Sequence, residues 1–283
     1  MVARSCDHDW VIVYQNETEF FVSGLVYVAG LLVLFHLAYV WAIFRKDFSV
    51  IDVFWGPSLA WAGLCGFLFA VGSGMSETVS VLGLGSLALL LAWALRLSGY
   101  IALRARRLGK EDARYANWRA QWGRRAISIA YVRVFLLQAA ISLWIGAPVF
   151  VAFRSKLGRE ETSLIEIVGL LAMLIGFVYE SVADFQKSAF KAKPEHKDRM
   201  LTSGLWKYSR HPNYFGEIVF WWGVSLSLFP QVAWWGLLPG LTINLLLLKV
   251  SGITLLEARY SARPEFAEYR RRTRALLPWW PRE

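Results

Sequence analysis

A polar segment near the C-terminus lies between two apolar stretches, and its residue types are those that bind anions. Residues 201–218 read LTSGLWKYSRHPNYFGEI. Pro212 suits the first turn of a helix, where its missing N–H costs nothing. The free N–H groups and dipole of a helix start attract an anion, and Lys207, Arg210 and His211 stand just before this one. The segment therefore predicts a site for a pyrophosphate or a carboxylate.

A cluster of basic residues at the cytoplasmic end of a helix would also explain Lys207 and Arg210. It would not explain the polar residues that follow them. Asn213 and Glu217 are four residues apart and share one face of the predicted helix. A second polar stripe occupies one face of the preceding apolar segment: Glu180, Asp184, Lys187 and Lys191. This stripe either belongs to the same site or is a set of ion pairs that caps a membrane span.

Ionisable residues within apolar segments are costly to place in a bilayer and are therefore functional candidates. Asp52 is the only carboxylate in the first three apolar segments. Arg96 lies several residues from the nearest segment end, so it serves either a site or a headgroup that its side chain reaches by snorkelling. His36, alone in an apolar segment, is expected to be a packed core histidine. The scattered histidines and the two cysteines predict no metal site.

The elements that position these residues are membrane-spanning helices. Hydrophobic residues make up 56% of the 283 residues and charged residues only 18%, which is too few charges for a typical soluble domain. The sequence predicts an all-α integral membrane protein with seven spans of roughly 20 residues. The expected spans are 20–44, 51–72, 78–101, 126–153, 163–185, 214–230 and 232–256.

The distribution of basic residues predicts the orientation. The loops 45–50, 102–125, 186–213 and 257–283 hold 24 Lys and Arg, against 4 on the opposite side. The positive-inside rule then places the N-terminus outside and the C-terminus in the cytoplasm. This asymmetry also accounts for most of the net charge of +10, so we expect membrane lipids and no nucleic acid as partners.

We expect a single membrane domain over 1–283, with substrate-side helices in 1–160 and cofactor-binding helices in 161–283. The loop 102–125 interleaves aromatic residues with arginines, which predicts an amphipathic helix at the membrane surface.

The segment GLWKYSRHPNYFGEIVFWWG at 204–223, with its flanking sequences at 184–204 and 255–281, resembles the C-terminal domain of the steroid 5-alpha-reductase family, and most of all its bacterial members. The resemblance covers about a third of the chain. It implies a seven-helix fold in a bacterial inner membrane, with a site for NADPH that faces the cytoplasm. The cofactor-binding residues that it implies are Arg96, Asp184, Lys187, Lys191, Tyr208, Arg210, His211, Asn213, Tyr214, Glu217, Lys249 and Tyr260.

The resemblance further implies reduction of the carbon–carbon double bond of a 3-oxo-4-ene steroid or a similar apolar enone lipid, by a monomer. The catalytic candidates are Asp52, Trp93 and Tyr100. A protonated Asp52, buried without a cation, would donate a hydrogen bond to the enone carbonyl, with Tyr100 as the substitute donor. Isoprenylcysteine carboxyl methyltransferases carry a similar Arg-His-Pro segment, so an S-adenosylmethionine-dependent methyltransferase is the alternative. A non-enzymatic lipid-binding or scaffold protein is a third reading.

Overall fold

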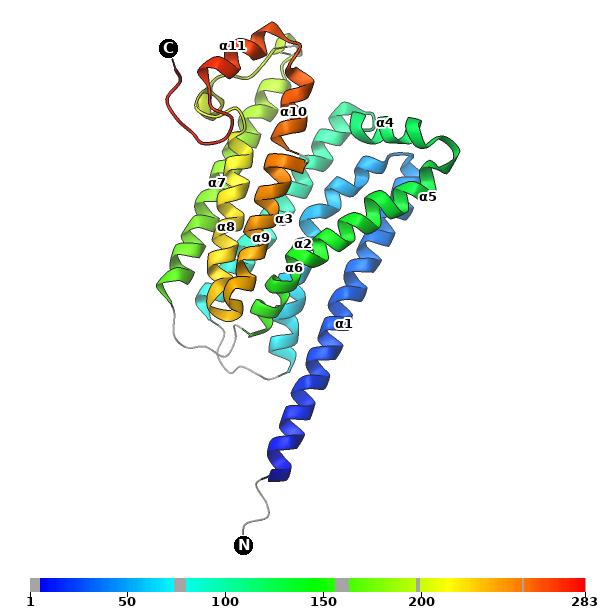
Figure 1. Cartoon of the computed structure of the whole chain (residues 1–283), viewed down its shortest axis with the longest axis vertical. Coiled ribbons are helices and arrows are strands. Elements are labelled where there is room, and N and C mark those ends of the chain that lie inside the picture. The colour runs from blue at the N-terminus through cyan, green and yellow to red at the C-terminus, as the bar shows by residue number, and fades with distance from the viewer. Residues whose placement is uncertain (1–5, 74–79, 156–162, 197–198, 251, 283) are drawn as a thin grey trace. The chain divides into compact units, whose positions relative to one another are not determined.

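The computed structural model describes residues 6–73, 80–155, 163–196, 199–250 and 252–282, and all regular secondary structure in this part is helical (Figure 1). Six stretches within it are long and apolar enough to cross a membrane: Glu17–Arg45, Phe48–Gly72, Val81–Leu108, Ala113–Arg154, Leu164–Lys191 and Pro212–Ala258. The last stretch contains both the sixth and the seventh predicted span. The predicted all-helical membrane fold is therefore confirmed, with six to seven candidate spanning helices, while the orientation stays a prediction.

The chain divides into two compact units. Unit 1 comprises Met1–Gly83 and Leu90–Glu160, and unit 2 comprises Leu84–Leu89 and Glu161–Glu283. The expectation of one domain stays a prediction.

Unit 1 is built around α1 (Cys6–Arg45), α2 (Ile51–Gly72) and α6 (Leu137–Ser155). Short helical segments, among them α5 (Ala126–Ala130), lead into α6. α1 begins 14 residues before the predicted span at 20–44, because the polar N-terminal stretch continues the helix instead of forming a tail. α2 has the predicted bounds.

The predicted surface helix at 102–125 is in fact split between two helices. α3 (Val81–Leu108) extends past the predicted span end and stops at Gly109, whose φ of +62° is a left-handed conformation that glycine adopts without strain. α4 (Ala113–Trp122) then starts with Asp112 as its N-cap, since that carboxylate accepts a hydrogen bond from the Arg114 backbone N–H. α4 lies beside the start of α2, because Arg114 and Tyr115 of α4 donate hydrogen bonds to Asp52 of α2.

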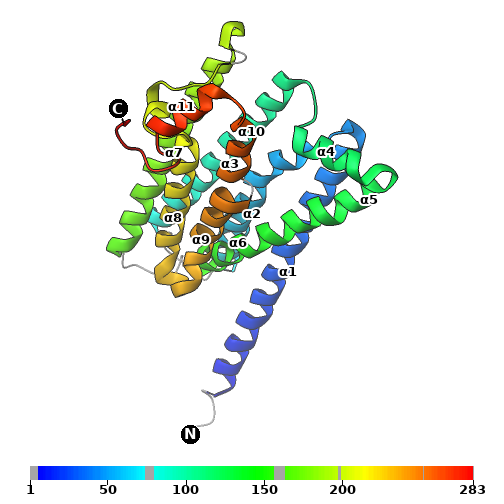
Figure 2. The same ribbon diagram turned by 45° about the horizontal axis from the view of Figure 1, so that its top comes forward.

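Unit 2 contains α7 (Leu164–Lys191), α8 (Pro212–Val232) and α9 (Leu238–Leu245), which stand side by side in both views (Figures 1 and 2). α10 (Ile253–Tyr260) and α11 (Pro264–Arg272) follow at one end of this group. Ser163 and Glu166 form a capping box that starts α7. Pro212 begins α8, which confirms the predicted helix start.

Glycines allow α7 and α8 to approach with their backbones in contact. A Cβ on Gly176 would lie 2.3 Å from the Phe220 backbone nitrogen, and a Cβ on Gly216 would lie 2.5 Å from that of Glu180. Such distances leave no room for a side chain, as in the small-residue interfaces of membrane helices. The contact at Gly216 sets Glu180 on α7 beside the first turns of α8, close to the polar residues of the predicted site.

Candidate functional site

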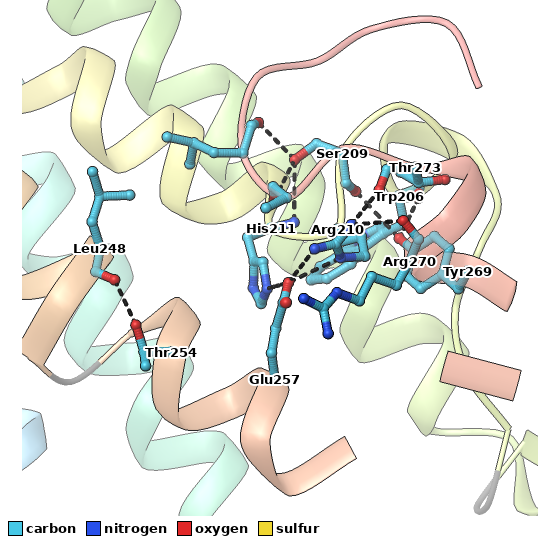
Figure 3. A network of polar contacts seen from close by, with 12 residues as sticks. Trp206, Ser209, Arg210, His211, Leu248, Thr254, Glu257, Tyr269, Arg270 and Thr273 are labelled. Carbon is cyan, nitrogen blue, oxygen red and sulfur yellow. Dashed lines mark hydrogen bonds and ion pairs between the residues drawn. The ribbon is translucent and has the colours of Figure 1, made fainter. Parts of the chain in front are cut away.

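An ion pair between Arg210 and Glu257 forms the centre of a polar cluster at the start of α8 (Figure 3). The guanidinium Nη2 and Nε of Arg210 donate to Oε1 of Glu257 at 2.7 and 2.9 Å. Arg210 is only 8% exposed. A guanidinium buried this deeply requires a carboxylate partner, because an unpaired buried charge is costly.

The same guanidinium also binds the C-terminal segment. Nη1 of Arg210 donates to the backbone carbonyls of Arg270, at 3.3 Å, and of Thr273. The Arg210 backbone N–H donates to the carbonyl of Arg274 at 2.9 Å. Tyr269 reinforces the junction, since its hydroxyl donates to the carbonyl of Trp206. Arg210 therefore holds the end of the chain against the start of α8, a structural role that the sequence did not indicate.

His211 contacts the same carboxylate and is electrically neutral in this setting. Its Nε2 lies 3.2 Å from Oε1 of Glu257, and its ring stacks on Tyr214 at 5.5 Å. Burial lowers the pKa of His211 from 6.5 to about 4. The positive charges of Lys187 and Arg210 contribute to this lowering of the pKa, and Glu257 opposes it. Two cations thus act on the residue that precedes the first turn of α8.

The start of α8 has the character that the sequence predicted for an anion site. His211 is its N-cap residue, and no side chain of the described residues caps the helix start. Asn213 is half-buried in the first turn. Lys187 reaches toward this region from α7, with its Nζ 4.8 Å from the ring centre of Trp206. Free helix N–H groups and nearby cations favour a bound anion.

Buried carboxylates line α7 and α8 beside this helix start. Glu180, Asp184 and Glu217 are 2%, 4% and 9% exposed. The backbone contact of Gly216 with Glu180 places two of these carboxylate residues on neighbouring turns of packed helices. The predicted polar stripe of α7 is therefore a buried feature at its Glu180 and Asp184 end.

Four other predicted cofactor residues lie at more peripheral positions of unit 2. Lys191 donates to the carbonyls of His196 and Arg199 at 3.3 and 2.8 Å, so it supports the loop that follows α7. The ring of Tyr208 meets Trp280 edge-on at 5.4 Å. Lys249 is exposed.

Tyr260, the last of the four, is 36% exposed and packs against Phe266 at 6.1 Å. Glu257, three residues before Tyr260, is a carboxylate at the edge of an apolar segment, and this signal marks it as a functional candidate in the sequence. Its pairing with Arg210, 47 residues away, was not indicated.

The catalytic candidates of the first half all lie in unit 1. Trp93 is fully buried on α3, and Arg96 and Tyr100 are half-buried on the same helix. The spacing of three and seven residues puts all three side chains on one helical face. The sequence predicted the three positions and the structure gives them a shared face, although it does not test their chemical roles.

The prediction that Asp52 is buried without a cation is wrong. Nη2 of Arg114 donates to Oδ2 of Asp52 at 2.9 Å, and the hydroxyl of Tyr115 donates to Oδ1 at 2.5 Å. Asp52 therefore joins the start of α2 to α4 as an ion-pair acceptor. The sequence analysis missed both partners because they lie 62 and 63 residues away along the chain.

Comparison with known proteins gives a family match and two distant relatives. The profile of a family described as "Protein of unknown function (DUF1295)" matches residues 38–273. An uncharacterized protein of Schizosaccharomyces pombe is 27% identical over 245 residues, which cover 77% of this chain and 68% of that protein. A protein of Ustilaginoidea virens named as a probable O-methyltransferase is 31% identical over 77 residues, 27% of each chain. No solved structure matches.

Proposed function

Because the chain belongs to the DUF1295 family, whose description names no activity, we propose its function from the polar cluster of unit 2. In this proposal, the protein is an integral-membrane reductase. It uses NADPH to reduce the carbon–carbon double bond of an apolar enone lipid, such as a 3-oxo-4-ene steroid.

The observation that carries the proposal is the convergence of Lys187 and Arg210 on His211 at the start of α8. Arg210 is already paired with Glu257, so it contributes local positive potential rather than a free hydrogen-bonding fork. Lys187 is the cation whose flexible ammonium would reach a phosphate group. A helix start together with this lysine is a suitable cradle for the pyrophosphate of a dinucleotide.

The buried polar residues next to this helix start fit the remainder of such a cofactor. Carboxylates such as Asp184 accept hydrogen bonds from ribose hydroxyls, as acidic residues do in other dinucleotide sites. Asn213 carries an amide that both donates and accepts, which matches the carboxamide of a nicotinamide. Glu217, four residues further along the same face of α8, would accept from that carboxamide. These assignments agree with those that the resemblance to the reductases implies.

Bound NADPH would supply a hydride to the β-carbon of the enone, and the protein would stabilise the enolate oxygen that forms as the carbonyl gains charge. Since Asp52 is paired with Arg114, the proposed hydrogen-bond donor is the hydroxyl of Tyr100. Trp93 and Arg96 lie on the same face of α3 as this hydroxyl. Solvent would supply the proton that the α-carbon takes up.

A second candidate function rests on the relative named as a probable O-methyltransferase, which matches 77 residues of the chain. In that reading the same polar cluster binds S-adenosylmethionine and the protein methylates a carboxylate or hydroxyl. The sulfonium of that cofactor is a cation and it carries no pyrophosphate. A positive region at a helix start therefore suits it less well than it suits NADPH.

Mass spectrometry of the nucleotide that is retained by the purified protein tests the choice between these functions. We expect NADPH or NADP⁺, together with transfer of tritium from labelled NADPH to an enone steroid. Asn213→Ala and Glu217→Ala should both abolish this transfer while the protein stays monodisperse in detergent. Retention of S-adenosylmethionine, with methyl transfer and no reduction, would reverse the assignment.

A further inference from the structure

A pocket with a volume of about 450 Å³ lies within unit 1, away from the residues assigned above. It is lined by the start of the apolar stretch of α1, the last turns of α2 and the end of α6. Its walls combine apolar side chains, among them Val22, Leu68 and Phe69, with two charged residues, Glu19 and Arg154. Apolar walls with a few charged groups are typical of small-molecule sites.

Two helices of spanning length end beside this pocket. α2 ends at Gly72 and α6 ends at Ser155, and both of these helix ends lie at the pocket. The ends of two apolar helices of spanning length thus meet at one pocket, as expected of a pocket at the depth of lipid headgroups. Phe21 and Leu68 are 66% and 53% exposed beside it, as expected of surfaces that face acyl chains.

Arg154 is the residue that points to a ligand. It is 9% exposed, and its Nε is buried with no hydrogen-bond partner among the residues that the structure describes. Its guanidinium lies 4.8 Å from the ring centre of Phe20 and interacts electrostatically with Glu19. A buried donor left without a partner is costly, so an acceptor at this position would be favoured.

We propose that this pocket binds a zwitterionic phospholipid, with its phosphate on Arg154 and its ammonium on Glu19. Guanidinium groups bind phosphate oxygens through paired N–H donors, which would satisfy the buried Nε. The acyl chains would pack on Leu68 and Phe69, which line the same pocket. An anionic lipid would meet the Glu19 carboxylate, and a lipid without phosphate would leave Arg154 unsatisfied.

Native mass spectrometry of the detergent-purified protein, titrated with single lipids, measures this preference. We expect dioleoyl phosphatidylethanolamine to bind about tenfold more tightly than dioleoylglycerol, or about 1.4 kcal/mol. Arg154→Gln should remove this difference, while Arg133→Gln, at an exposed arginine of the same unit, should preserve it. Equal binding of both lipids to the wild type, or equal loss in the two variants, would overturn the proposal.

Gly72 allows a test that leaves both charges in place. It lines the pocket, and a Cβ at this position meets no atom within 4 Å, so Gly72→Leu fills the pocket without a clash in the protein. This variant should lose the phosphatidylethanolamine preference and keep its thermal stability. Gly99→Leu is the matched control, because it too is a helical glycine with open space around it. Full lipid binding by Gly72→Leu would show that the lipid sits elsewhere.

Glu19 tests the ammonium half of the proposal. Glu19→Gln should abolish discrimination between phosphatidylethanolamine and the anionic phosphatidylglycerol, whereas the wild type should prefer the former. Soluble glycerophosphoethanolamine should fail to displace the bound lipid, since it lacks the chains that contact Leu68 and Phe69. The assignment would be contradicted if glycerophosphoethanolamine displaced the bound lipid at a concentration equal to that of the lipid. It would also be contradicted if the wild-type protein bound phosphatidylglycerol more tightly than phosphatidylethanolamine.

Discussion

Arg210 and Glu257 are 47 residues apart in the chain and meet at 2.7 Å, so that one buried ion pair joins the start of α8 to α10. The same guanidinium binds backbone carbonyls of the C-terminal segment. The motif that predicted an anion site therefore also contains the main structural link of unit 2. Two roles for one motif lead to different predictions for its individual residues.

Arg210→Gln should destabilise unit 2 strongly, because it leaves the half-buried carboxylate of Glu257 without its cation. Breaking a buried ion pair by removing one partner typically costs about 3–5 kcal/mol. Equilibrium unfolding in mixed detergent micelles measures the loss. Arg271→Gln is the matched control, since Arg271 pairs with Glu268 on the exposed side of α11 and its replacement should leave the unfolding midpoint unchanged. Equal effects of the two variants would show that the Arg210 pair is not a structural link.

The pKa of His211 predicts how stability depends on pH. Because this pKa is about 4 in the folded protein and 6.5 ordinarily, the unfolded state binds more protons between these values. The contribution of His211 is therefore complete above pH 6.5 and is lost as the pH falls toward 4, by roughly 3 kcal/mol at 1.36 kcal/mol per pH unit. His211→Gln should flatten this dependence and His36→Gln should keep it. An unfolding midpoint of the wild type that is constant from pH 7 to pH 4.5 would contradict the assignment.

The close approach of α7 and α8 predicts a severe effect of one methyl group. Gly216→Ala would place a Cβ 2.5 Å from the backbone nitrogen of Glu180, and backbone atoms cannot move aside cheaply. Overpacking of this kind costs about 1–3 kcal/mol. Gly24→Ala, where the new Cβ meets nothing within 4 Å, should be neutral or slightly stabilising. Thermal unfolding of both variants measures the difference. A Gly216→Ala protein as stable as the wild type would mean that α7 and α8 lie further apart.

The sequence predicted the helices because they depend on local patterns, whereas the roles of the polar site residues stay a prediction. Apolar runs fixed the spans, and α2 has the expected bounds. The start of α8 followed from Pro212, whose effect on a helix is local. The break between α9 and α10 and the helical N-terminal stretch of α1 were missed, since no residue type marks them unambiguously.

Contacts between distant segments were beyond the reach of these patterns. No residue near Asp52 in the sequence predicts its contact with Arg114. No residue near Arg210 predicts its contacts with the carbonyls of Arg270 and Thr273. Both pairings arise from packing of helices within a unit. Sequence reasoning therefore assigned Asp52 an acidic role and Arg210 a free charge, whereas the structure gives each of them a partner.

Because Asp52 is an ion-pair acceptor, we expect substitutions at Tyr100 and at Asp52 to have different effects. Tyr100→Phe should lower the rate of enone reduction by roughly 10²–10³, the effect of removing one oxyanion-type donor, and leave NADPH affinity unchanged. Tyr39→Phe, at a tyrosine that is not assigned to the site, should retain full activity.

Asp52→Leu is expected to act mainly on stability, because Arg114 and Tyr115 lose their shared acceptor. Steady-state kinetics with an enone steroid, together with unfolding midpoints, distinguish the two effects. A fully active Tyr100→Phe enzyme would remove Tyr100 from the mechanism.

The affinity of the purified protein for NADPH, measured by isothermal titration calorimetry in detergent, tests the central proposal most directly. The account predicts that NADPH binds at least about tenfold more tightly than NADH, or about 1.4 kcal/mol, because the cations near the start of α8 would also hold the 2′-phosphate. Lys187→Gln should weaken NADPH binding by a similar factor, and Arg106→Gln, at an exposed arginine of α3, should not change it. Binding of S-adenosylmethionine without binding of NADPH, or equal affinities for NADPH and NADH, would contradict it.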